Sequence, residues 1–210
     1  MTKMERLIEK ISKLKKGKTG KIVKTRMKEF SALGKKSSKE WFKELCFCVL
    51  TANCAANVCI NIQKVIGEGF ITLTERQLAR KLRENGYRFP NLRANYIVSN
   101  RSYVHFLKKE LKEFSDPEAR KWLVDNIKGL GYKEASHFLR NVGYKNVAII
   151  DFHIIDILAK NKLIQRPKTL TRTNYLMIEE VLRLLAEESG LNLAELDLYL
   201  WFLETGKVLK

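Results

Sequence analysis

Two residues with side chains suited to covalent and acid-base chemistry stand out in this sequence, Lys133 and Asp151. Lys133 follows the tripeptide Gly129-Leu130-Gly131, and Asp151 comes eighteen residues later. A lysine amine attacks carbon only when neutral, and its ordinary pKa of about 10.4 means that it needs burial or neighbouring positive charge to lose its proton. The first turn of a helix supplies positive charge. The pattern therefore favours an amine nucleophile with a carboxylate downstream.

The tripeptide before Lys133 predicts a turn between two helices. Residues 122–127 carry the apolar pattern of one helix, and the glycines then allow a turn without strain. The first amides of the next helix have no partner within it, and its dipole is positive there. Gly129, Leu130 and Gly131 are therefore expected to bind a DNA phosphate through the backbone. The alternative is a plain helix connection with a glycine cap.

Asp151 is predicted to be the N-cap of a helix. It follows the apolar run 147–150 and precedes the helical pattern 152–158. We interpret the run, which is too short to seed a sheet, as a buried connection that delivers Asp151 to a cleft. A solvated lysine and an ordinary cap are the simpler interpretations of Lys133 and Asp151 taken singly. Their occurrence together with the hairpin favours the chemical interpretation.

The elements that must position these residues are predicted to be helices, because helical periodicity covers nearly the whole chain and no convincing alternating strand occurs. Helix starts are indicated at Ser37-x-x-Glu40, Thr74-x-x-Gln77 and Asp116-Pro117, and stops at Gly86, Gly143, Gly190 and Gly206. One helix is expected from Arg93 to Phe114, and one apolar helical region from Trp41 to Ile66. The fold class is therefore all-α.

The composition agrees with a polyanionic partner. The 40 Lys and Arg against 23 Asp and Glu give a net charge of +17, although heat-adapted and ribosomal proteins are basic too. The 210 residues, 45% of them hydrophobic, can bury one sizeable core or two small ones that share a cleft. No segment approaches the roughly 20 apolar residues of a membrane span, and none resembles a signal peptide. We expect an intracellular protein without a membrane partner.

No metal or cofactor is expected. The four cysteines, Cys46, Cys48, Cys54 and Cys59, lack the spacing of iron-sulfur cluster ligands, and we interpret them as buried reduced thiols. The three histidines, His105, His137 and His153, form no metal-ligand spacing with nearby acids. Of these three, His153 is the one expected near the cleft.

The hairpin, Lys133 and Asp151 together resemble the pattern of the helix-hairpin-helix DNA glycosylases. The last ten residues, Trp201 to Lys210, resemble the ending of the archaeal-type 8-oxoguanine DNA glycosylase/AP lyases, a branch also found in some bacteria. Tyr87-Arg88-Phe89 and Asn91-Leu92-Arg93-Ala94 extend the resemblance to nearly the whole chain. It implies two helical subdomains that flank a DNA-binding cleft.

The resemblance also implies a domain organisation. Residues 1–210 are expected to form one glycosylase unit with approximate subdomains 30–115 and 116–210. The helix from Arg93 to Phe114 is expected to bridge them. Residues 1–29 are expected to pack beside the C-terminal helices.

The implied activity is that of a bifunctional base-excision enzyme. Lys133 is expected to attack the sugar of a flipped 8-oxoguanine nucleotide, form a Schiff base and nick the strand by β-elimination, with Asp151 stabilising positive charge on the sugar. No cofactor is implied. The expected partner is double-stranded DNA containing 8-oxoguanine, bound by a monomer in the cytoplasm at the nucleoid.

Four further residues are assigned to the base pocket or to the gap in the duplex. Trp201 is expected either to stack on the flipped base or to pack in the core. The resemblance implies that the carboxylate of Lys210, the last residue of the sequence, accepts a hydrogen bond from N7-H of 8-oxoguanine, which guanine lacks. Arg88 and Phe89 are expected to fill the gap left by the flipped nucleotide or to contact the orphaned cytosine.

Two other functions remain open from the sequence. One is a glycosylase for a different oxidised base, which is favoured if Trp201 and Lys210 play no part in selectivity. The other is a noncatalytic helix-hairpin-helix module, in which Lys133 is one more basic side chain. The position of Lys133 beside the hairpin argues against the module, and the C-terminal pattern favours 8-oxoguanine.

Overall fold

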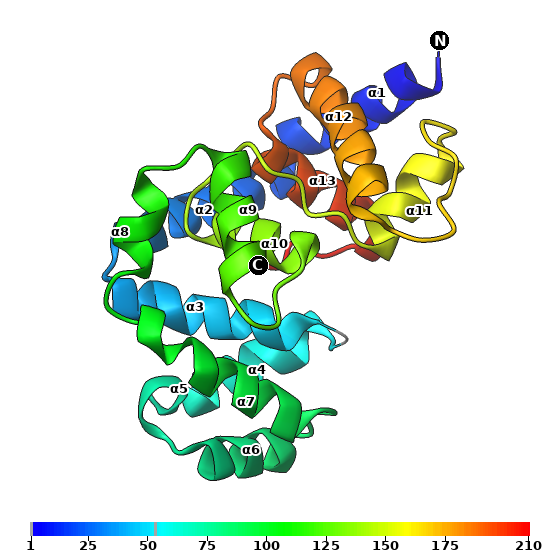
Figure 1. The fold of residues 1–210 in the computed structure, drawn as a ribbon. Helices are drawn as coiled ribbons and strands as arrows, with labels where there is room; N and C mark the ends of the chain where they lie inside the picture. The colour runs from blue at the N-terminus through cyan, green and yellow to red at the C-terminus, as the bar shows by residue number, and fades with distance from the viewer. Residues whose placement is uncertain (1, 53) are drawn as a thin grey trace.

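The computed structural model describes residues 2–52 and 54–210, and in these stretches every regular element is a helix (Figure 1). The elements are α1 (Lys3–Lys16), α2 (Lys18–Lys35), α3 (Ser38–Thr51), α4 (Ala56–Ile66), α5 (Gly69–Thr72), α6 (Glu75–Glu84), α7 (Pro90–Ser99), the 3-10 helix η1 (Asn100–Tyr103), α8 (Leu107–Lys112), α9 (Asp116–Asn126), α10 (Tyr132–Asn141), α11 (Phe152–Lys160), α12 (Arg172–Glu188) and α13 (Leu193–Thr205). The predicted all-α class is confirmed. None of these helices has both the length and the apolar character that crossing a bilayer demands.

Local capping signals explain where several helices begin and end. Ser37 and Thr74 are the N-caps of α3 and α6, and the side chain of each accepts a hydrogen bond from the amide three residues on. The start predicted at Asp116 is confirmed, but the cap itself is Ser115, which shares a capping box with Glu118. The four predicted stops, Gly86, Gly143, Gly190 and Gly206, have φ values of 75°, 99°, 60° and 72°.

The single helix predicted from Arg93 to Phe114 is wrong, because η1 interrupts it between α7 and α8. The buried side chain of Asn100 accepts a hydrogen bond from the backbone amide of Lys128 and donates one to its carbonyl, both at 3.0 Å. This contact fixes the turn of the hairpin against η1. The apolar region from Trp41 to Ile66 is likewise two helices, α3 and α4.

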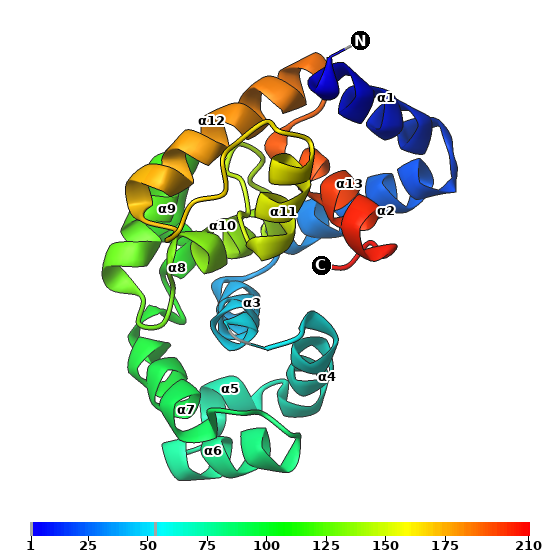
Figure 2. The same ribbon diagram turned by 90° about the vertical axis from the view of Figure 1, so that its right-hand side faces the viewer.

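The buried apolar side chains form two clusters. The first draws its members from residues 41–147, and the second from residues 7–30 together with residues 148–200. Figure 2 shows α4 to α7 at one end of the molecule and α1, α11, α12 and α13 at the other. Residues 119–147 therefore share a core with the helices before them, and the subdomain boundary between residues 115 and 116 stays a prediction.

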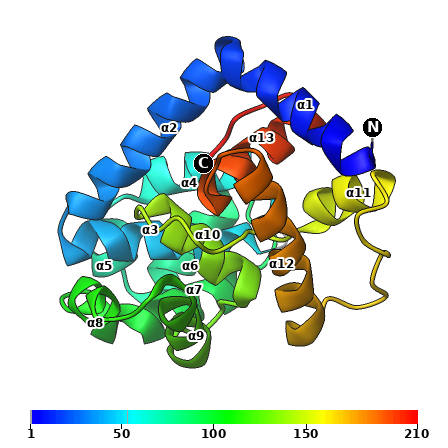
Figure 3. The ribbon, with the colours of Figure 1, turned by 90° about the horizontal axis from the view of Figure 1, so that it is seen from above.

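α1 packs against α12 and α13, and α2 packs against α13 and α10 (Figure 3). Leu7 and Ile11 of α1 and Val23 of α2 belong to the same buried cluster as Leu185 and Leu198. The second half of α2 reaches α10, where the backbone of Gly34 lies so near the carbonyl of Val142 that an added Cβ would be 2.4 Å from its oxygen. The N-terminal helices thus brace both α13 and the end of α10.

Candidate active site

The predicted hairpin is the turn between α9 and α10, and it depends on one of its two glycines. Gly129 has a φ of 87°, and a Cβ there would lie 2.6 Å from the ring of Tyr96. Both conformation and space therefore demand glycine. Gly131 has an extended backbone with a φ of −99° and is the N-cap of α10, so its conformation does not require glycine. Leu130 between them is buried.

Glu134 occupies the start of α10, a role that sequence reasoning missed. Its Oε2 accepts a hydrogen bond of 3.3 Å from the amide of Gly131, and its Oε1 lies 3.0 Å from Nζ of Lys133. The residue stands at the third position of the helix, where a glutamate completes a capping box, so the signal was present. In this structure a carboxylate thus covers one of the amides predicted to bind phosphate, and that function of Gly129, Leu130 and Gly131 stays a prediction.

Asp151 lies where the sequence placed it, at the end of a buried connection and at the N-cap of α11. Its Oδ1 accepts a hydrogen bond of 3.0 Å from the amide of Ile154. Among the ion pairs of residues 2–52 and 54–210, however, the partner of Lys133 is Glu134 and not Asp151. The two predicted catalytic residues are therefore each held by a local contact.

The connection before Asp151 obtains its hydrogen bonds from side chains of α12. The amide of Ala148 donates to Glu179 Oε1 at 2.7 Å, and the amide of Ile150 donates to the hydroxyl of Tyr175 at 3.2 Å. The same hydroxyl donates to the carbonyl of Ala148 at 2.7 Å. Because buried backbone groups need partners, α12 substitutes for a neighbouring strand and fixes the path to Asp151.

Glu179 is in turn neutralised by Arg120 of α9. Nη1 and Nη2 of Arg120 lie 2.5 and 2.7 Å from Oε1 and Oε2 of Glu179, and the two side chains are 2% and 3% exposed. The guanidinium also lies 5.1 Å from the ring centroid of Tyr132, at the start of α10. One buried ion pair therefore joins the hairpin, α12 and the connection to Asp151.

Replacing Arg120 by methionine is expected to lower the free energy of unfolding by about 3–5 kcal/mol, because it leaves the carboxylate of Glu179 buried without its cation. Urea denaturation measures this loss. The matched control is Lys121→Met on the same helix, where the exposed pair with Asp125 predicts a change within about 0.5 kcal/mol. Equal stability of the two variants would contradict the assigned role of Arg120.

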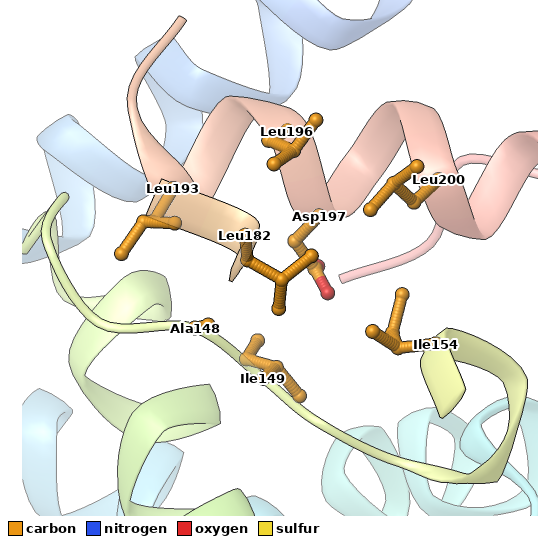
Figure 4. A pocket seen from close by; sticks show the side chains of 8 residues that line it. All are labelled: Ala148, Ile149, Ile154, Leu182, Leu193, Leu196, Asp197 and Leu200. Carbon is orange, nitrogen blue, oxygen red and sulfur yellow. The ribbon is translucent and has the colours of Figure 1, made fainter. Parts of the chain in front are cut away.

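A second buried ion pair joins α10 to α13. Nη1 of Arg140 contacts Oδ2 of Asp197, and the side chains are 5% and 8% exposed. Asp197 also lines a cavity of about 10 Å³ among apolar side chains that include Ile154 and Leu200 (Figure 4). Burial raises the pKa of Asp197 to about 6, against the opposing charge of Arg140 and with a smaller contribution from the charge of Asp151. The charge of Asp151 therefore influences Asp197.

The carboxyl resonance of Asp197 is expected to titrate near pH 6 in an NMR experiment. Because the folded pKa lies above the ordinary value of 3.8, the folded state keeps a proton that the unfolded chain has lost, and the contribution of Asp197 to stability falls as pH rises from about 4 to about 6. Above pH 6 the ionised Asp197 lowers the free energy of unfolding by on the order of 1–3 kcal/mol. A midpoint below pH 4 would show that Arg140 outweighs burial.

The aromatic residues around Asp151 come from α11 and α13. The ring of Trp201 meets that of His153 edge to face at 4.7 Å, and His153 lies 3.9 Å from the ring of Phe152, which is 62% exposed. Trp201 is partly buried, and its Nε1 has no hydrogen-bond partner among the described residues. A partly buried Trp201 is compatible both with packing in the core and with stacking on a flipped base. Its place in the base pocket stays a prediction.

Arg88 and Phe89 lie on the loop between α6 and α7. Both are exposed, and the guanidinium of Arg88 lies 5.1 Å from the ring centroid of Phe89. The buried Tyr87 fixes the loop, because its hydroxyl donates to the carbonyl of Leu50 at 2.7 Å. Phe89 is therefore not buried, and contact of either side chain with the duplex stays a prediction.

Lys210 lies beside α3 and α10. Its ammonium contacts Glu44 and Gln63, and its backbone lies near the imidazole of His137, which stands one turn beyond Lys133 on α10. Burial, followed by the charges of Arg140, Lys133 and Lys210, holds the pKa of His137 well below its ordinary value, so the imidazole is neutral. His137 therefore has both Lys133 and Lys210 among its neighbours.

The four cysteines are free thiols, most of them buried. Cys46, Cys48 and Cys59 are buried, whereas Cys54 is partly exposed, and all four thiols are free. Burial raises the pKa of Cys46 and Cys48 well above the ordinary value, which disfavours the thiolate that metals bind. Within residues 2–52 and 54–210, no group of three or more His, Cys, Asp or Glu side chains is placed to hold a metal ion.

The hairpin, a lysine in the first turn of its second helix and an aspartate that caps the next helix define the architecture of a helix-hairpin-helix DNA glycosylase. The family model described as 8-oxoguanine DNA glycosylase matches residues 23–191, and the chain belongs to this family.

Named relatives match along almost their whole length. The 8-oxoguanine DNA glycosylase/AP lyase of Korarchaeum cryptofilum is 49% identical over 97% of this chain and 98% of its own. The crystal structure of the Methanocaldococcus jannaschii 8-oxoguanine glycosylase/lyase, in complex with a 15mer DNA containing 8-oxoguanine, matches with a TM-score of 0.94 and 53% identity over 98% of this chain and 100% of that one. The crystal structure of the 8-oxoguanine DNA glycosylase of Thermotoga maritima matches with a TM-score of 0.92 and 43% identity, over 99% of this chain and 100% of that one.

Proposed function

We propose that this protein excises 8-oxoguanine from double-stranded DNA and then cleaves the abasic strand by β-elimination. The observation that carries the proposal is Lys133 in the first turn after the hairpin, with Asp151 capping the next helix, in a chain that matches the glycosylase family over residues 23–191. The net charge of +17 suits a polyanionic duplex. The proposed enzyme acts as a monomer on the DNA of the nucleoid.

Lys133 is the proposed nucleophile. After the damaged nucleotide is flipped from the stack, Nζ forms a bond to C1′ and the bond from C1′ to N9 breaks, with its electron pair leaving on the base, which takes up a proton. The sugar ring opens to an imine between C1′ and Nζ. Loss of a proton from C2′ then breaks the bond from C3′ to its oxygen and nicks the strand, and water releases the amine. Nζ must leave Glu134 before this attack, because the two form an ion pair in the structure.

Asp151 is the proposed electrostatic partner of this reaction. Its ionised carboxylate stabilises the positive charge that develops on the sugar as the base departs. One oxygen is held by the amide of Ile154, so the carboxylate is fixed in orientation before DNA binds. Gly129, Leu130 and Gly131 are proposed to hold a backbone phosphate once Glu134 moves from the Gly131 amide.

The proposed base pocket combines Trp201 and Lys210, with Arg88 and Phe89 at the gap in the duplex. Trp201 lies beside His153, two residues after Asp151, which places an aromatic face near the proposed chemistry. The carboxylate of Lys210 would accept a hydrogen bond from N7-H of 8-oxoguanine but face an acceptor in guanine. The exposed Arg88 and Phe89 are available to the duplex.

The test is incubation of excess protein with a duplex that carries one 8-oxoguanine opposite cytosine, with release of the base and nicking of the strand both measured. The matched control is the same duplex with guanine. We expect both products from the damaged duplex alone. Release of a different oxidised base in a parallel assay, with none from 8-oxoguanine, would favour the other glycosylase, and binding without either product would favour the noncatalytic module.

A further inference from the structure

The ammonium of Lys210 is held in a pocket formed by two other helices. Nζ lies 3.1 and 2.9 Å from the two carboxylate oxygens of Glu44 on α3 and 2.5 Å from Oε1 of Gln63 on α4. It also lies 4.1 Å from the ring centroid of Phe47, where a cation is attracted to the ring face. The side chain of Lys210 is 22% exposed. The cation is therefore turned toward the protein.

Glu44 is built to receive this cation. It is 3% exposed, and both of its oxygens accept hydrogen bonds from other side chains as well: 2.6 Å from Nδ2 of Asn141 and 3.0 Å from Nε2 of Gln63. A buried carboxylate is costly unless it is paired and hydrogen-bonded, and Lys210 supplies the charge that Glu44 needs. Lys210, Asn141 and Gln63 all donate to Glu44, so the site fits a carboxylate and not an amide.

The network continues from Glu44 into α10. Asn141 accepts hydrogen bonds from Nε and Nη2 of Arg140 at 3.1 and 2.9 Å, and Arg140 is paired with Asp197 of α13. The helix that carries Lys133 at its start is therefore tied near its end to both Glu44 and α13. Lys210 connects to this arrangement through its side chain, while its backbone reaches His137, whose Nε2 is buried and has no partner among the described residues.

We propose that Glu44 is a positioning residue for base selectivity: by binding the ammonium of Lys210, it fixes the backbone and carboxylate of that residue at the place where the flipped base is recognised. The proposal rests on the proposed function, because it requires that the carboxylate of Lys210 bind the flipped base. Glu44 contacts neither Lys133 nor the base in this assignment, and it acts through Lys210.

This arrangement predicts a separation of the two activities. Excision requires the intact base to be held correctly, and a displacement of about 1 Å costs up to roughly a hundredfold in rate. Nicking of a strand that already carries an abasic site needs the amine and the sugar, but no base. Loss of the Glu44 anchor therefore reduces excision of 8-oxoguanine and its preference over guanine, and leaves nicking at a preformed abasic site.

The experiment compares Glu44→Gln with the wild type in single-turnover excision of 8-oxoguanine, excision of guanine and nicking of preformed abasic DNA. The amide presents donors to the donors of Lys210, Asn141 and Gln63, so it disrupts the anchor with little change of shape. We expect excision to fall roughly ten- to a hundredfold, with nicking within about twofold of the wild type. The matched control is Glu40→Gln, one turn earlier on α3, whose partner is Lys43.

Lys210→Met removes the cation of the same ion pair. The urea unfolding midpoint shows whether Glu44→Gln is folded. If it is not, Lys210→Met tests the proposal in its place. The same separation of activities is expected from it. Unchanged excision and selectivity in the folded variants would overturn the proposal, as would a proportional loss of excision and nicking, because that is the result of a merely structural role. A wild type that releases no 8-oxoguanine would instead overturn the proposed function.

Discussion

Replacing Lys133 by glutamine is expected to abolish strand nicking and the release of 8-oxoguanine by the covalent route. The amide of glutamine is too weak a nucleophile to attack C1′ and displace the base, and it cannot form the imine that β-elimination requires. The substitution leaves the start of α10 supported, because the amide of Gly131 still donates to Glu134 and because Tyr132 still packs against Arg120 and, at a ring distance of 5.5 Å, Tyr175. The lost activity is then attributable to the amine and not to the fold.

Borohydride trapping measures this outcome directly, since it reduces an imine between protein and sugar to a stable covalent adduct. The wild type is expected to give the adduct with the damaged duplex, and Lys133→Gln none. The control Lys121→Gln removes an exposed lysine of α9 that pairs with Asp125, and it should trap like the wild type. An adduct from Lys133→Gln would mean that another amine is the nucleophile.

The features of this fold that the sequence predicts are those that depend on residues close together in the chain. Ser37, Thr74 and the four glycine stops act within one turn of the chain, so side-chain type and spacing suffice to place the helix ends. The same holds for Asp151, because an N-cap after a short apolar run needs only its neighbours. The positions of Lys133 and Asp151 at the starts of their helices could therefore be predicted from the sequence, and their chemical roles stay predictions.

The parts that escaped prediction depend on partners distant in the sequence. Arg120 meets Glu179 from 59 residues away, and Lys210 meets Glu44 from 166 residues away. Periodicity predicts that such residues are exposed, because isolated charges are rarely buried. Only the packing of helices shows that they are paired. The chain around η1 also has a distant partner, since the side chain of Asn100 hydrogen-bonds to the backbone of Lys128 in the hairpin.

Glu134 was only partly predictable, because its spacing indicates a helix cap but does not indicate its contact with Lys133. A glutamate at the third position of a helix completes a cap, and this one does so, but its second oxygen also binds the amine of Lys133. The structure therefore places a carboxylate where both the phosphate and the nucleophile are proposed to act. In the proposed complex Glu134 has to leave both groups, which would link recognition of the backbone to release of the amine.

Replacing Asp151 by asparagine is expected to reduce the rate of base excision by roughly 10²- to 10⁴-fold while the affinity for the damaged duplex is retained. Asparagine is as good an N-cap as aspartate, so its side-chain oxygen can still accept the hydrogen bond from the amide of Ile154. The substitution therefore removes charge and keeps the helix. Single-turnover excision and a titration of the same duplex measure the two quantities.

Asp197 supplies an internal check on this variant. The charge of Asp151 is one cause of the raised pKa of Asp197, so removing that charge should lower the pKa of Asp197 below about 6 even without DNA. A lowered NMR midpoint with unchanged DNA affinity would show that Asp151→Asn is folded and altered only in charge. Loss of excision in that protein then follows from missing stabilisation of the sugar cation. Excision at the wild-type rate would show instead that the carboxylate of Asp151 is not needed as an anion and that its capping of α11 is its whole contribution.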